Sequence, residues 1–104
     1  MTRRVVVTGM SGVTAFGNDW QHIEPKLKAC ENATQYMPSF EQYDGLNTKL
    51  AAPIDDFQLP KHYKRKQVRG MGRVSRLATV ATENALEQAG LIGHDILTNG
   101  ETGI

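Results

Sequence analysis

The segment Arg3–Asp19 constrains most strongly what this chain can fold into. Three consecutive valines, Val5 to Val7, follow two arginines, and such an apolar run without alternation is typical of a strand covered on both faces of a parallel or mixed sheet. Glycines at positions 9, 12 and 17 then permit the positive φ angles of tight turns. Asn18 and Asp19 supply short side-chain acceptors of the kind that cap a helix N-terminus. The order of strand, glycine-rich loop and helix predicts an α/β fold.

This opening also carries a family resemblance. Residues Arg3–Gly9, with Val13-Thr14 and Gly17–Asp19, resemble the first strand and loop of β-ketoacyl-acyl-carrier-protein synthases. These are type II condensing enzymes of the thiolase-like superfamily, found in fatty acid and polyketide biosynthesis. The chain departs from the usual pattern at Ser11, Gly12 and Ala15, which indicates a divergent subgroup. The resemblance implies a thiolase-like α/β fold with residues 3–8 as its first core strand.

The C-terminal residues indicate how much of such a fold this chain contains. In the resembling family a Gly-Ile-like pair opens the second strand of the sheet, and this sequence stops at Gly103-Ile104. We therefore expect the 104 residues to be the N-terminal quarter of a longer enzyme. Residues 1–104 would then form the N-terminal portion of one ketoacyl synthase domain, incomplete alone and without an internal boundary.

Composition limits the classes to which the protein can belong. The net charge of +1 names no partner by itself, and 104 residues suffice for one domain with a modest core. The apolar run after Arg4 is too short for a secretory leader, and no stretch approaches the roughly 20 apolar residues of a membrane span. The single cysteine excludes an internal disulfide framework and fits a reducing compartment. We expect a cytoplasmic protein that does not insert into a membrane.

The residues after Asp19 predict a first helix, because Trp20, Ile23 and Leu27 recur at helical spacing. Pro25 leaves two alternatives: the helix begins near Glu24, or a short first turn is followed by a kink. Cys30 falls at the C-terminal end, where the helix dipole disfavours a thiolate. A small filler residue is therefore the favoured interpretation of Cys30, over a reactive nucleophile.

Residues 31–60 are punctuated by prolines yet too apolar for a disordered tail, so we expect an ordered excursion packed on a neighbouring surface. A short strand is predicted over Lys49–Ile54. Asp55 and Asp56 follow it. Adjacent side chains on an extended chain point in opposite directions, so a solvated turn is favoured over an acid/base or metal site.

Positive charge concentrates in the next segment. Seven of the twelve Lys and Arg residues fall within sixteen positions, namely Lys61, Lys64, Arg65, Lys66, Arg69, Arg73 and Arg76. A solvated helix face is the plainest explanation, and nucleic-acid binding lacks accompanying aromatic residues or a motif. The family resemblance implies a more specific explanation of this positive segment. Residues 65–71 are similar to the basic segment that docks the acidic acyl carrier protein, with Lys66 and Arg69 at matching positions and Gly70 at a third position that is usually basic.

A long helix is predicted from about Met71 to Ala89. Apolar residues recur every three or four positions and trace one face, formed by Met71, Val74, Ala78, Ala81, Ala85 and Ala89. The alanines permit close backbone approach, so we expect this face to be buried. Gly90 supplies a positive-φ stop, with Leu91 behind it.

No catalytic residue is assigned to this chain. The condensation that the resemblance implies needs a cysteine thiolate and two histidines, and in the family these come later than residue 104. His22, His62 and His94 match none of them and are expected at the surface. Neither a cofactor nor a metal is expected. The partner implied is acyl carrier protein, with a homodimer or related heterodimer for the whole enzyme and no nucleic-acid partner.

Two other classes remain open. Val-Val-Val-Thr-Gly could begin a dinucleotide-binding oxidoreductase, but glycines at 9, 12 and 17 do not fit G-x-G-x-x-G. A non-catalytic module whose basic segment binds an acidic protein would need none of the missing catalytic groups.

Overall fold

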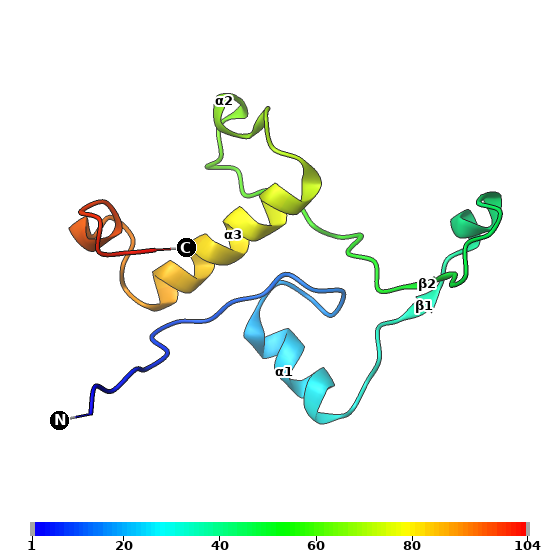
Figure 1. Ribbon diagram of the computed structural model, residues 1–104, viewed down its shortest axis with the longest axis horizontal. Helices are drawn as coiled ribbons and strands as arrows, with labels where there is room; N and C mark the ends of the chain where they lie inside the picture. Colours follow the sequence, from blue (N-terminus) through cyan, green and yellow to red (C-terminus); the bar gives the residue numbers. More distant parts are fainter. Residues whose placement is uncertain (1, 104) are drawn as a thin grey trace. The chain divides into compact units, whose positions relative to one another are not determined.

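The computed structural model describes residues 2–103 (Figure 1). The chain divides into two compact units, one formed by residues 1–12 and 58–104 and the other by residues 13–57. The second unit contains α1 (Trp20–Lys28), β1 (Gln35–Tyr36), the 3₁₀ helix η1 (Pro38–Gln42) and β2 (Leu50–Ala51). The first contains α2 (Arg65–Val68), α3 (Arg73–Gln88) and the 3₁₀ helix η2 (Asp95–Leu97). That residues 1–104 belong to one synthase domain stays a prediction.

The expected first strand is not formed. Residues 3–8 carry no secondary structure, and the side chains of Val5 and Val7 are 95% and 83% exposed. A strand needs a neighbour to receive its N–H and C=O groups, and no other described residue pairs with this segment. The sheet that the described residues do form is small and antiparallel, with Gln35 opposite Ala51 and Tyr36 opposite Leu50.

The first helix begins where its cap predicts. Asp19 is the N-cap of α1, and its Oδ1 accepts a hydrogen bond from the backbone N–H of His22 at 3.0 Å. Pro25 lies inside the helix, which begins at Trp20, so the alternative of a start near Glu24 is wrong. Ile23 is the buried residue of α1, at 5% exposure.

The end of α1 gives Cys30 a backbone role. Its N–H donates to the carbonyl of Leu27 at 3.0 Å, and the N–H of Glu31 donates to the carbonyl of Lys26 at 3.0 Å. These two bonds form a Schellman motif, which requires the left-handed conformation that Cys30 adopts with φ of 55°. Because Cys30 is exposed, the prediction of a packing filler is wrong.

The predicted excursion over residues 31–60 contains β1, η1 and β2, but several of its large apolar side chains are not packed within the described chain. The predicted strand is present as β2, and Asp55 and Asp56 are exposed as expected of a solvated turn. Lys49 Nζ pairs with Glu41 Oε2 at 2.6 Å, and Glu41 also accepts the hydroxyl hydrogen bond of Tyr36. The large apolar side chains remain exposed, because no surface covers them within the described chain: Tyr36, Tyr43, Leu46 and Leu50.

The long helix is confirmed as α3, with Gly72 as N-cap and Gly90 at φ of 72° after its end. The predicted buried face is wrong in part. Val74 is 78% exposed and Ala78 is exposed, whereas Val80, on the opposite side, is 6% exposed. Periodicity reports which residues share a face, but the elements that pack against a helix decide which face is buried.

Close backbone approach does occur near the C-terminal end of α3. A Cβ placed on Gly9 would lie 2.3 Å from the carbonyl oxygen of Ala85 and 3.1 Å from Ala89 Cβ. The N–H of Met10 donates to Gln88 Oε1 at 2.6 Å. Gly9 does not have a positive φ, so the need for glycine here comes from this contact and not from a turn.

No helix within residues 2–103 is long and apolar enough to cross a membrane. The expected second strand at Gly103-Ile104 reaches a residue outside those described.

Candidate functional site

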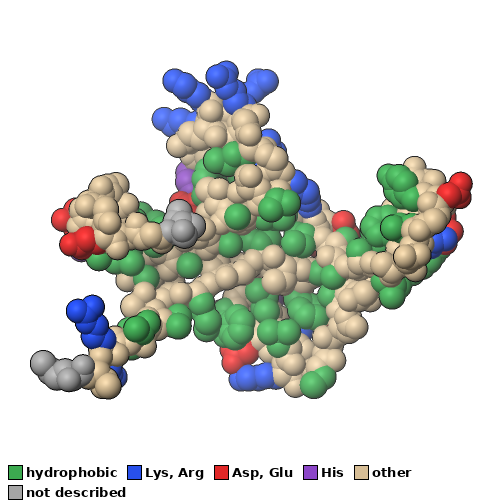
Figure 2. Space-filling model, in the orientation of Figure 1, with side chains coloured by type: hydrophobic (Ala, Val, Ile, Leu, Met, Phe, Trp, Pro, Cys, Tyr) green, Lys and Arg blue, Asp and Glu red, His purple; other side chains and the backbone are tan. Residues whose placement is uncertain are grey.

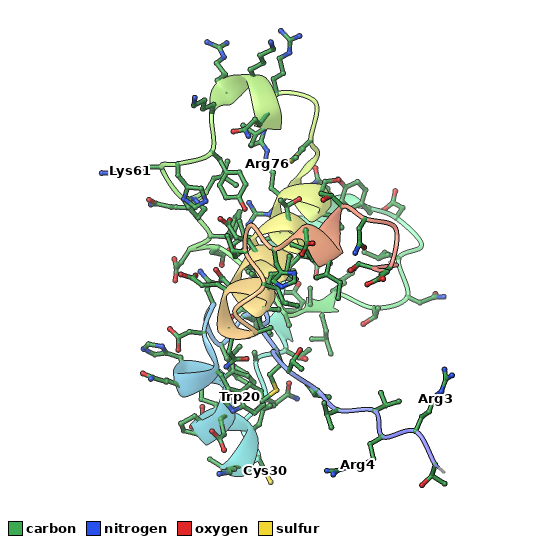
Figure 3. All side chains as sticks on the ribbon, turned by 90° about the vertical axis from the view of Figure 1, so that its left-hand side faces the viewer. Arg3, Arg4, Trp20, Cys30, Lys61 and Arg76 are labelled. Carbon is green, nitrogen blue, oxygen red and sulfur yellow. The ribbon has the colours of Figure 1, made fainter. Side chains whose placement is uncertain are left out.

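The positive segment folds into a surface carried by α2. We call Lys61, Lys64, Arg65, Lys66 and Arg69 the basic surface; all five side chains are exposed. Figure 2 shows blue side chains gathered over the part of the chain that carries α2, and in Figure 3 Lys61 points away from the ribbon. Arg73 and Arg76 belong to α3 and lie outside this definition.

The local sequence explains why α2 forms. Lys64 is the extended N-cap, with φ of −75° and ψ of 144°. The Gln67 side chain accepts from the Lys64 N–H at 2.9 Å, while the Gln67 N–H donates to the Lys64 carbonyl at 2.9 Å. The Arg69 N–H closes the turn on the Arg65 carbonyl at 3.0 Å. Lys66 and Arg69, three residues apart across this turn, are thereby placed as neighbours.

One hydrogen bond joins α2 to α3, and one residue of α2 is buried. Val68, the apolar residue of α2, is buried. Its carbonyl accepts a long hydrogen bond of 3.4 Å from Arg76 Nη2, and Figure 3 shows Arg76 below α2. One side of the short helix is therefore fixed to the scaffold and the other presents cations.

A second attachment to α3 lies just before α2. Glu83 of α3 accepts a hydrogen bond from the Tyr63 hydroxyl, and its Oε1 lies 2.7 Å from His62 Nε2. The rings of His62 and Tyr63 are 4.5 Å apart. The Tyr63 hydrogen bond is the main cause that lowers the pKa of Glu83, and burial followed by that same bond raises the pKa of Tyr63 to about 12.

None of the cations of the basic surface forms an ion pair within residues 2–103, where the pairs involve other bases. No acid lies in the sequence between Asp56 and Glu83, and both oxygens of Glu83 already have partners. The surface consequently keeps its positive charge, which attracts an anionic partner and accelerates its association. Sequence reasoning located the cations but missed Glu83.

The histidines lie at the surface, as predicted, and each has a hydrogen-bond partner. His22 Nδ1 is 2.7 Å from Asp19, His62 contacts Glu83, and the His94 ring accepts from the Ile96 N–H at 3.1 Å. No group of three or more metal-ligating side chains occurs in the described part of the chain. A shallow pocket of the unit 13–57 is lined by Phe16, Lys26 and the carboxylates of Asp55 and Asp56, with neither a histidine nor a cysteine.

Comparison with known proteins agrees with the sequence resemblance. A family described as "Beta-ketoacyl synthase, N-terminal domain" matches residues 2–104. Nodulation protein E of Rhizobium meliloti (strain 1021) is 37% identical over 92 residues, covering 88% of this chain and 22% of that protein. The 3-oxoacyl-[acyl-carrier-protein] synthase 1 of Haemophilus influenzae is 29% identical over 102 residues, 98% of this chain and 24% of that protein.

Comparison with solved structures agrees with the sequence comparisons. The crystal structure of a beta-ketoacyl synthase from Burkholderia phymatum STM815 matches with a TM-score of 0.84 and 46% sequence identity, over 98% of this chain and 25% of that one. The chain thus spans about a quarter of the length of the relatives it matches. The chain belongs to the β-ketoacyl synthase family, whose N-terminal-domain model matches residues 2–104.

Proposed function

We propose that the whole protein containing this chain is a 3-oxoacyl-[acyl-carrier-protein] synthase of fatty acid or polyketide biosynthesis. It would join an acyl group, held as a cysteine thioester, to a malonyl unit on acyl carrier protein. Loss of CO₂ from the malonyl unit leaves a carbanion that attacks the acyl carbonyl, and the cysteine leaves as a thiolate. The family match over residues 2–104 supports this assignment.

The cysteine and two histidines of that reaction would come from parts of the protein outside these residues, and this chain alone would be inactive. The reaction exchanges carbon and thioester groups without a redox step and needs no cofactor. We further propose that the whole enzyme acts in the cytoplasm as a homodimer or related heterodimer, within a thiolase-like fold in which residues 3–8 become the first core strand.

This chain would contribute part of the docking surface for acyl carrier protein, with Lys66 and Arg69 at its centre. The observation that carries the proposal is the basic surface itself: exposed cations, fixed by α2 and left without intramolecular ion pairs in the described chain. Acyl carrier protein is acidic, so such cations would lower the energy of its complex and steer its approach.

The test is charge reversal in the intact gene product. Lys66→Glu and Arg69→Glu should each raise KM for malonyl-acyl-carrier-protein about threefold to tenfold at low salt, as expected for charges at an interface. Lys28→Glu is the matched control, because Lys28 is an exposed cation of α1 that pairs with Glu24. Unchanged turnover and carrier affinity in both surface variants would refute the docking role.

A non-catalytic module that binds an acidic protein makes the same docking prediction. The mass of the intact gene product separates the two functions. A mass about four times that of this chain fits a complete synthase, since the chain covers 25% of the Burkholderia enzyme.

A further inference from the structure

We infer that Glu83 is a positioning residue for carrier-protein docking: its carboxylate holds His62 and Tyr63, and through them the start of the basic surface, against α3. This inference rests on the proposed function of that surface. Glu83 is separated by 20 residues from Tyr63 and by 21 from His62, so these contacts join the loop to a different element and are not a local turn.

The geometry gives both oxygens of Glu83 a partner. Oε1 lies 2.7 Å from His62 Nε2, and Oε2 accepts from the Tyr63 hydroxyl. The ring centroids of His62 and Tyr63 lie 4.5 Å apart with 32° between the ring planes, so the two side chains that bind Glu83 also contact each other. Hydrogen bonds to a charged group are about twice as strong as neutral ones, so the Glu83 carboxylate makes a stronger link than a neutral acceptor would.

The position of the link in the chain determines its effect. Tyr63 immediately precedes Lys64, the N-cap of α2, and its N–H donates to the Pro60 carbonyl at 3.1 Å. Within α2, Val68 is buried and its carbonyl accepts the long bond from Arg76. A helix of four residues has little stability of its own, because helix nucleation is costly. Without Glu83 the cations would sample more positions, so ordering them on docking would cost entropy and weaken the complex.

Glu83 leaves the five cations of the basic surface without an ion pair. It is the first acid in the sequence after Asp56, and its two oxygens contact His62 and Tyr63.

The experiment compares two substrates of the intact gene product: malonyl-acyl-carrier-protein, and a malonyl thioester of a small thiol that has no protein carrier. Glu83→Ala should raise KM for the carrier-bound substrate about threefold to tenfold without changing kcat, and should leave both constants for the small thioester unchanged. Glu83→Gln retains an acceptor for the Tyr63 hydroxyl and should restore part of the loss. Tyr63→Phe, which keeps the ring, should show a smaller rise of the same kind.

Glu87→Ala is the matched control. Glu87 is the next acid of α3, one turn further on, is exposed, and forms no ion pair in the described chain. It should leave both substrates unaffected. An unchanged KM for the carrier-bound substrate in Glu83→Ala, or an equal rise for both substrates, would overturn the inference while leaving the synthase assignment intact. Wild-type protein that condenses neither substrate would instead refute the proposed function.

Discussion

Cys30 and Gly90 occupy the same position, the first residue after the C-cap, in α1 and α3. Each donates its N–H to the carbonyl three residues earlier at 3.0 Å, and each is followed by a residue that closes a Schellman motif. Their φ angles are 55° and 72°. Glycine adopts the left-handed conformation freely. In Cys30 the Cβ comes too close to the following carbonyl oxygen.

Replacing Cys30 with glycine should therefore stabilise the intact protein by about 1 kcal/mol. The measurement is the free energy of unfolding from a urea titration. Cys30→Ala removes the thiol but keeps the Cβ, so it should bring no such gain, and Gly90→Ala should lose about 1 kcal/mol. Equal stability of Cys30→Gly and Cys30→Ala would show that the left-handed conformation carries no strain.

The contact between Gly9 and α3 makes a second prediction. Gly9→Ala places a carbon 2.3 Å from the Ala85 carbonyl oxygen, so helix and segment must separate. Ala89→Leu overfills the same contact from the other side, because the Ala89 Cβ lies 3.1 Å from the added carbon. Each should cost about 1–3 kcal/mol in the intact protein, measured by the same titration. Gly70→Ala, whose added Cβ meets no atom within 4 Å, is the control and should change little.

Charge can also be added to the basic surface. Gly70 is exposed, directly follows Arg69, and has open space around an added Cβ. Gly70→Lys should lower KM for the carrier-bound substrate about twofold to fivefold at low salt, the scale of one exposed charge pair. The gain should disappear as salt is raised, because exposed charges are screened. A gain that persisted at high salt would point to an effect other than charge.

The link between Tyr63 and Glu83 predicts a stability profile in pH. The pKa of Tyr63 is raised from 10.0 to about 12, so its stabilisation is complete below pH 10 and is lost as the pH rises toward 12. The pKa of Glu83 is lowered from 4.5, so its stabilisation is present above that pH and is lost as the pH falls below it. The melting temperatures of the wild type and of Tyr63→Phe should differ by a constant amount between these two pH limits. Outside the limits the two melting temperatures should converge. A difference independent of pH would contradict the link.

What could be predicted from the sequence is what neighbouring residues determine. The Asp19 cap and the Gly90 stop act over three to five residues, and both are where the pattern indicates. The cations of residues 61–69 were located because charge clustering is visible in the sequence, and exposure is the ordinary fate of such residues.

What could not be predicted depends on distant partners. Val80 and Val74 fit a helical period equally well, and only tertiary contacts bury the first and expose the second. The role of Glu83 arises from a contact across 20 residues that no spacing encodes. The prediction of a strand at residues 3–8 fails for the same reason, because a strand forms only when a second segment pairs with it.

The exposed valines near the N-terminus bear on how the protein must be made. Val5, Val6 and Val7 are all exposed, and the described residues offer them no cover. An uncovered β-branched segment can pair with the same segment of another nascent copy. Yield of the intact protein in the cell should thus depend on holdase chaperones and on slow, low-temperature synthesis, independently of its final stability.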